Sequence, residues 1–120
     1  MKKTNVFILL FLFLFISLNN NFSQGTSIGY YDGEQREYFK KKLKIYYIPE
    51  RINDQTYITD INNFVASKNG LIDSVYTVFS FTIGEVTFTS SESDALILID
   101  EFIQSNLFQH VRLRSEIRPN

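Results

Sequence analysis

The sequence predicts an α+β domain with the element order β-α-β-β-α-β, a four-stranded antiparallel sheet and two helices on one face of that sheet. Three observations lead to this prediction. Residues 71–90 form two β-rich runs around a reversal. A strand-like run at 43–48 and a helix-like run at 56–67 precede them, and a helix-like run at 94–108 and a strand-like run at 110–114 follow. Because βαβ units cross over in a right-handed sense, this order places the first and third strands in the centre and leaves one face uncovered.

The central runs are predicted to form a β-hairpin. Valine, phenylalanine, tyrosine and threonine dominate residues 71–90, and these residue types favour strands. Gly84 supplies the backbone freedom of a tight reversal, so the turn is expected at residues 82–85. The apolar side chains predicted to face the helices are Val75, Phe79, Phe81, Val86 and Phe88.

The first strand and helix have clear ends. Apolar and polar residues alternate over 43–48, and Pro49 should end the strand because it has no amide hydrogen to donate. Asp54 or Thr56 is expected to cap the helix that follows, and Asn69-Gly70 is expected to end it, because glycine readily takes the left-handed conformation. The predicted apolar stripe of this helix is Ile58, Ile61, Phe64 and Val65.

The second helix and last strand complete the domain. Glu92 and Asp94 suit the positive end of the helix dipole at the start of residues 94–108. Val111 and Leu113 should point inward from the strand at 110–114. The predicted apolar stripe of the helix is Leu96, Ile99, Phe102, Ile103 and Leu107. Two helices over one face of such a sheet make a ferredoxin-like sandwich.

The chain divides into four parts. Residues 1–24 are predicted to be an export signal, because Lys2 and Lys3 precede an apolar run and a polar stretch follows it. The run is shorter than the roughly 20 apolar residues that span a bilayer, so we expect an exported protein, periplasmic or secreted, without a stable membrane span after cleavage. Residues 25–42 are predicted to be a flexible leader with a short helical turn at 34–41, residues 43–114 the domain, and residues 115–120 a tail.

Composition narrows the choice of partner. The chain has 120 residues, 12 of them basic and 13 acidic, and removal of Lys2 and Lys3 would leave a net charge of −3. This weakly acidic balance gives no reason to expect a nucleic-acid partner. Cysteine is absent, so no disulfide supports the fold. Of the 12 phenylalanines and 7 tyrosines, the 7 phenylalanines and 7 tyrosines that follow residue 24 must supply much of the core.

Three segments carry a family resemblance. Residues 70–75, GLIDSV, resemble a G-V-x-x-V segment entering a second strand, and 86–88, VTF, and 97–103, ILIDEFI, match a third strand and an amphipathic helix. With them, residues 43–114 resemble the heavy-metal-associated (HMA) domains of copper chaperones and metal-transporting ATPases, which implies the ferredoxin-like fold. That family binds soft metal ions with an M-x-C-x-x-C loop after the first strand. Here residues 47–54 read YIPERIND, without thiolate or thioether, so the resemblance implies the fold without the metal site.

The sequence shows no catalytic constellation, so we predict a non-catalytic protein with no cofactor. His110 is the only histidine, and no G-x-S-x-G motif is present. Residues 84–88, GEVTF, lack the basic motif of RNA-recognition domains, and residues 49–56 lack the glycines of an acylphosphatase-like anion loop. The alternative left open is a degenerate metal-handling protein that binds metal weakly through His110 and carboxylates.

The uncovered face of the predicted sheet is the candidate binding surface. Tyrosine and arginine, which protein interfaces favour, gather there. We therefore expect a protein partner, either a different protein or a second copy of the chain; the alternative is that these residues are ordinary cross-strand pairs facing water. The candidate face comprises Lys44, Tyr46, Tyr76, Val78, Arg112 and Arg114, with Glu85 and Thr87 among them.

Overall fold

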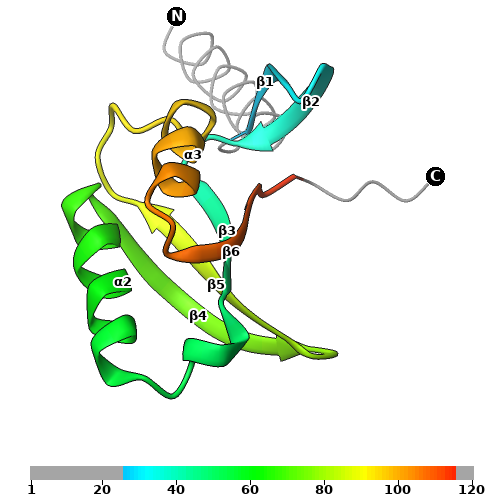
Figure 1. The fold of residues 1–120 in the computed structure, drawn as a ribbon. Coiled ribbons are helices and arrows are strands. Elements are labelled where there is room, and N and C mark those ends of the chain that lie inside the picture. Colours follow the sequence, from blue (N-terminus) through cyan, green and yellow to red (C-terminus); the bar gives the residue numbers. More distant parts are fainter. Residues whose placement is uncertain (1–25, 116–120) are drawn as a thin grey trace, which may run out of the picture.

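The computed structural model describes residues 26–115 (Figure 1). The predicted export signal, its cleavage site and residues 116–120 of the predicted tail lie outside the described residues. The elements in chain order are β1 (Thr26–Tyr31), β2 (Glu34–Phe39), β3 (Lys42–Tyr47), the 3-10 helix η1 (Pro49–Arg51), α2 (Gln55–Ser67), β4 (Gly70–Val78), β5 (Phe81–Phe88), α3 (Ala95–Gln104) and β6 (Phe108–Leu113).

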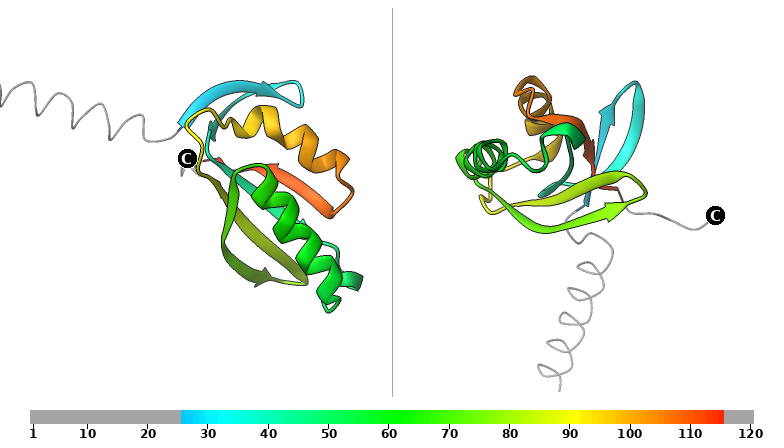
Figure 2. Two further views of the ribbon diagram at one scale, coloured as in Figure 1. Left: turned by 90° about the vertical axis from the view of Figure 1, so that its left-hand side faces the viewer. Right: turned by 60° about the horizontal axis from the view of Figure 1, so that its bottom comes forward.

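The predicted α+β class and main sheet are confirmed. Four strands are ordered β4-β5-β3-β6, and all three neighbouring pairs are antiparallel. β3 and β5, the first and third strands of the predicted domain, therefore lie in the centre. Both helices lie on the same side of this sheet (Figure 2). The opposite face, called the open face below, carries no helix of the described part of the chain.

The hydrophobic core lies between the two helices and the sheet. Tyr57 and Phe102 are its largest fully buried side chains. The predicted core positions Ile61, Val65 and Ile99 are also fully buried, because they recur at helical spacing on the faces that meet the sheet. The sheet side of the core comes from alternate residues of the strands, namely Leu43, Ile45, Tyr47, Val86, Phe88 and Val111.

Helix boundaries differ from the predictions in two places. The carboxylates of Asp54 and Asp94 accept hydrogen bonds from the backbone amides two residues on, so both acids cap a helix as expected. α2 does end before Asn69-Gly70, but Asn69, at φ 60°, and not Gly70 takes the left-handed conformation. α3 ends at Gln104 instead of Phe108, because Asn106 also turns left-handed at φ 59° and redirects the chain into β6.

The turn of the β4–β5 hairpin lies at Phe79 and Ser80, so its prediction at residues 82–85 is wrong. Gly84 instead lies inside β5, opposite Ile45 of β3. A Cβ atom at Gly84 would approach the Cγ1 atom of Ile45 to 3.0 Å and the Cε1 atom of Tyr47 to 3.2 Å. Gly84 allows close packing in the core and does not form a turn. A glycine between two β-rich runs has the same local pattern in both cases, which explains the wrong prediction of the turn.

The shifted turn changes which hairpin side chains are buried. Val86 and Phe88 are buried against the helices, as predicted. Val75, Phe79 and Phe81 are exposed, with relative accessibilities of 54%, 96% and 38%, so their predicted burial against the helices is wrong. Phe79 cannot alternate with its neighbours, because it occupies the turn itself.

An additional hairpin occupies most of the predicted leader. β1 and β2 pair antiparallel around a turn at Asp32 and Gly33, so the helical turn expected at residues 34–41 is not formed. The Tyr38 hydroxyl donates to the Asp94 carboxylate at 2.8 Å, which connects the hairpin to the start of α3. The Phe39 amide donates to the Arg114 carbonyl oxygen at 2.8 Å. Among the described residues, no helix has the length and apolar character needed to cross a membrane.

Candidate functional site

The sheet register brings the predicted binding residues onto one face. Lys44 of β3 lies between Arg112 of β6 and Glu85 of β5. Tyr46, two residues on, lies between His110 and Ile83. Because side chains two residues apart share a face, these pairings place the central predicted residues together on the open face. Tyr76 and Val78 extend this face on β4, opposite Ile83 and Phe81 of β5.

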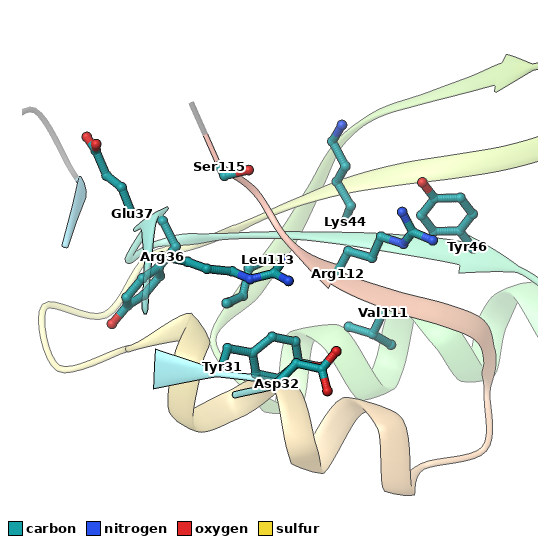
Figure 3. Close-up of a pocket in the computed structure, with 11 residues that line it drawn as sticks. Tyr31, Asp32, Arg36, Glu37, Lys44, Tyr46, Val111, Arg112, Leu113 and Ser115 are labelled. Atoms are coloured by element: carbon teal, nitrogen blue, oxygen red, sulfur yellow. The ribbon is translucent and has the colours of Figure 1, made fainter. Parts of the chain in front are cut away.

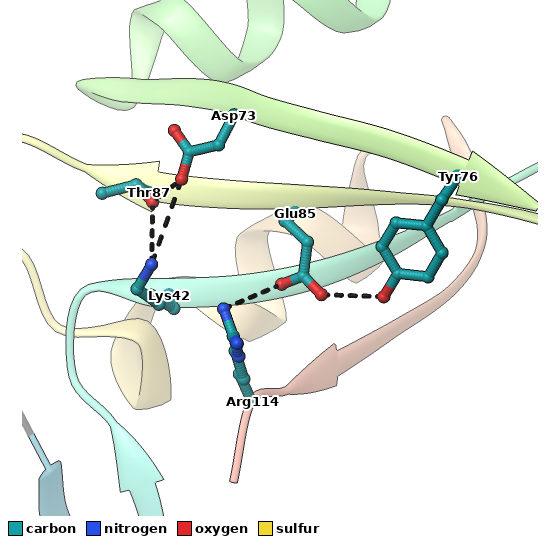
Figure 4. Close-up of polar contacts among 6 residues, drawn as sticks. All are labelled: Lys42, Asp73, Tyr76, Glu85, Thr87 and Arg114. Carbon is teal, nitrogen blue, oxygen red and sulfur yellow. Dashed lines mark hydrogen bonds and ion pairs between the residues drawn. The ribbon is translucent and has the colours of Figure 1, made fainter. Parts of the chain in front are cut away.

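Part of the open face is occupied by its own polar contacts. The Glu85 carboxylate accepts a hydrogen bond from the Tyr76 hydroxyl at 2.8 Å and pairs with the Arg114 guanidinium at 3.5 Å (Figure 4). The Glu85 side chain is only 12% exposed, so these contacts satisfy a carboxylate that has lost most of its water. Tyr76 and Arg114 therefore stabilise the fold by holding the Glu85 carboxylate.

A second polar cluster lies beside the first. The Thr87 hydroxyl donates to the Asp73 carboxylate, and the Lys42 ammonium group lies 4.0 Å from the same carboxylate and 3.5 Å from the Thr87 oxygen (Figure 4). Asp73 is the extra residue where the β4–β5 register shifts. The irregularity thus turns a carboxylate toward the neighbouring strands, and the sequence did not predict this cluster.

The two other basic residues of the open face, Lys44 and Arg112, form no such pair with a carboxylate of the described residues. The Arg112 guanidinium lies 5.5 Å from the centroid of the Tyr46 ring, a cation–π contact. His110 packs edge-on against the same ring, with centroids 5.8 Å apart. No ion pair joins Lys44 or Arg112 to another residue within 26–115. The centre of the open face is therefore an aromatic ring flanked by two cations without a carboxylate partner there.

A hollow of about 510 Å³ adjoins this centre (Figure 3). It lies between the β1–β2 hairpin and the β3 and β6 strands, and three of the predicted face residues line it. Sequence reasoning missed the hairpin's contribution, although Asp32-Gly33 is a strong hairpin signal. The lining residues are Tyr31, Asp32, Arg36, Glu37, Tyr38, Lys44, Tyr46, Val111, Arg112, Leu113 and Ser115.

Two tyrosines next to these surfaces resist ionisation. Burial, followed by the hydrogen bond to Asp94, raises the pKa of Tyr38 to about 12. Burial and the hydrogen bond to Glu85 raise the pKa of Tyr76 to about 12 as well. In both cases the hydroxyl donates a hydrogen bond to the carboxylate, so removal of the hydroxyl proton would put two negative charges side by side.

We expect these tyrosines to make the fold sensitive to alkaline pH. Their pKa is higher in the folded chain than the ordinary value of 10.0, so the stability they provide is fully present below pH 10 and is lost as pH rises toward 12. Urea unfolding followed by circular dichroism from pH 8 to 12 measures the loss. The double variant Tyr38→Phe/Tyr76→Phe should flatten it, whereas Tyr30→Phe at an exposed position should not. An equally steep loss in the double variant would contradict this assignment.

Comparisons with known proteins add no assignment. No family model matches the chain, and neither curated proteins nor solved structures gave a significant match. The resemblance to HMA domains thus stays a prediction. Within residues 26–115, no group of three or more histidine, cysteine, aspartate or glutamate side chains is placed to hold a metal ion. His110, which the alternative metal-handling hypothesis names, packs edge-on against Tyr46.

Proposed function

We propose that this protein is a small exported, non-catalytic binding module of ferredoxin-like, HMA-like fold that docks a partner protein on its open face. The strand order β4-β5-β3-β6 and the two helices on one side support the fold assignment. The segment after β3, where HMA domains bind metal, is here η1 with Pro49, Glu50 and Arg51. This set of side chains supports a module that retains the fold without soft-metal chemistry.

One observation carries the proposal: Lys44 and Arg112 flank Tyr46 on an uncovered sheet face without a carboxylate partner among the described residues. Two neighbouring cations repel each other, and a partner that presents carboxylates relieves this repulsion while steering its own approach. Tyr46 supplies the flat apolar surface that interface centres favour. The expected partner therefore carries an acidic segment.

The adjoining hollow favours a partner that inserts a segment of its chain over a partner that only lies flat on the sheet. The hollow continues from Lys44 and Arg112 to Arg36 and Tyr31 on the β1–β2 hairpin. A chain segment lying across Tyr46 can therefore enter the space between the hairpin and β6. Asp32 and Glu37 line the same space, so the carboxylates of the partner are expected to meet the Lys44 and Arg112 side and not the hairpin tip.

The test is affinity capture from the native cell envelope with the wild-type protein and with Arg112→Glu, followed by binding measurements on the captured partner. Charge reversal at Arg112 should weaken binding roughly ten- to hundredfold. Arg112 is exposed, and its contact is a cation–π pair, so circular dichroism should show an intact fold. Arg114 is the poorer position to reverse, because it also holds Glu85.

Lys68→Glu is the matched control. Lys68 follows α2 on the helix side of the sheet, and its partly exposed pair with Glu101 contributes little to stability. This variant changes the net charge by the same amount as Arg112→Glu but leaves the open face intact. A partner held equally by wild type and Arg112→Glu, or lost equally in both variants, would exclude the open face as the docking surface.

A further inference from the structure

The far half of the β4–β5 hairpin is a stretch without charge. Residues 74–84, SVYTVFSFTIG, contain no acidic or basic side chain and lie between Asp73 and Glu85. We call them the uncharged arm. Its turn lies at the end of the main sheet opposite the β1–β2 hairpin (Figure 1). Several apolar side chains of the arm are exposed, most of all Phe79 at 96%.

β4 is an edge strand, so one of its sides has no sheet neighbour among the described residues. Proteins usually protect such edges with charges, prolines or bulges against pairing with another chain. The first half of β4 has this protection, since the register shifts between Ile72 and Ser74 and Asp73 supplies a charge. The second half, residues 74–78, pairs regularly with β5 and has none of these features.

The other edge of the sheet is different. β6 carries Arg112, so two copies paired along β6 would bring two guanidinium groups into the same contact. The hollow beside β6 is also bounded by the β1–β2 hairpin. Residues 74–78 contain no charge that could oppose itself. Of the two edges of the main sheet, β4 is therefore the one compatible with a second copy of the same chain.

Phe79 adds an independent observation. Its backbone is left-handed, with φ 55°, at the first position of a two-residue turn where glycine is favoured. The backbone of a phenylalanine is strained in this conformation, and the ring is almost fully exposed within the single chain. Because neither local conformation nor the core favours phenylalanine at this position, its apolar ring is best explained by a contact outside the single chain.

We propose that two copies of this chain pair antiparallel along residues 74–78 of β4, which joins their main sheets into one continuous sheet around a twofold axis. Each copy uses the one unprotected edge of its main sheet, so pairing through this sheet closes as a dimer. Antiparallel pairing places the turn of each copy beside the beginning of the neighbouring β4. There, the Phe79 ring covers Leu71 of the second copy, which is 59% exposed in the single chain. This pairing does not depend on the docking function of the open face.

The first measurement is the mass of the exported protein, purified after its own processing, by sedimentation velocity over a range of concentrations. We expect a monomer and a dimer whose ratio follows mass action, and slower hydrogen exchange at the amides of residues 74–78 in the dimer. A monomer at every concentration would overturn the proposal. Particles that keep growing beyond the dimer would overturn it too, because they would show an edge that does not close.

Two variants test the surface. Val75→Lys adds an ammonium group to each copy next to the twofold axis and should abolish the dimer; Gln109→Lys puts the same charge on exposed β6 and should not. Phe79→Gly removes the ring while suiting the left-handed turn, so the fold should stay intact and the dimer should weaken roughly tenfold. A dimer unchanged by Val75→Lys would exclude β4 as the dimer interface. A dimer unchanged by Phe79→Gly would exclude the proposed contact between Phe79 and the second copy.

Discussion

Replacement of Phe102 by alanine is expected to lower the free energy of unfolding by about 3–5 kcal/mol. Phe102 of α3 is fully buried, and its ring meets three other phenylalanine rings. The centroid distances are 4.9 Å to Phe64 of α2, 5.7 Å to Phe88 of β5 and 5.8 Å to Phe108 of β6. Truncation leaves a cavity where both helices meet the sheet, and a chain without disulfides has no cross-link to offset the loss.

Ile97→Ala is the matched control for this prediction. Ile97 is on the same helix but is 71% exposed, so its truncation removes little buried surface and should change stability by less than about 0.5 kcal/mol. Urea unfolding followed by circular dichroism compares the two variants with wild type. A cost below about 1.5 kcal/mol for Phe102→Ala would mean that the four rings do not form a tightly packed cluster.

Replacement of Tyr57 by phenylalanine is expected to cost about 2–4 kcal/mol, although only one oxygen atom is removed. The Tyr57 hydroxyl accepts a hydrogen bond from the Ile48 amide at 2.9 Å and donates one to the Leu107 carbonyl oxygen at 2.5 Å. It therefore connects the end of β3 with the segment before β6, from a side chain that is fully buried on α2. Without the hydroxyl, a partly buried amide and a partly buried carbonyl group both lose this partner.

Tyr47→Phe separates this effect from the general loss of a tyrosine hydroxyl. Tyr47 of β3 is also in the core, at 5% exposure, but its hydroxyl makes no hydrogen bond in the described part of the chain. We expect this variant to stay within about 0.5 kcal/mol of wild type. Equal costs for the two variants would show that the bridge between Ile48 and Leu107 contributes nothing beyond burial of the ring.

Both predictions bear on the proposed binding surface. Tyr57 and Phe102 pack against one side of the main sheet, and Lys44, Tyr46 and Arg112 project from the other. Because the sheet is a single layer, the spacing of the three open-face residues depends on how the core holds β3 against β6. Core variants that stay folded are therefore expected to change affinity only indirectly, whereas Arg112→Glu acts on the contact itself.

The strand and helix pattern was largely predictable from hydrophobic periodicity. Alternation in residues 43–48 placed Leu43 and Ile45 inward and Lys44 and Tyr46 outward, as observed. The helical spacing of Ile61 and Val65 identified the buried stripe of α2. These signals are reliable because each side chain's orientation follows directly from the local backbone period. The open-face positions of Lys44 and Arg112 followed from the same alternation.

The errors came from residues whose role depends on distant neighbours. Gly84 has the local character of a turn residue, but it lies in β5 because Ile45 and Tyr47 leave no room for a Cβ atom there. Phe79 has the character of a core residue, but it forms the turn. The Asp32-Gly33 hairpin signal was missed, because residues 25–42 have few aliphatic side chains to bury and were therefore predicted to be a flexible leader.

Local sequence determined where the helices begin, which faces of β3, α2 and α3 are apolar, and the order of the main-sheet elements, because capping and periodicity act within a few residues. Only the tertiary structure decided that the β1–β2 hairpin stands beside β6, that Glu85 is occupied by Tyr76 and Arg114, and that Lys44 and Arg112 are left without such a partner within residues 26–115. Those outcomes depend on distances between residues far apart in the chain, and no local pattern encodes such distances.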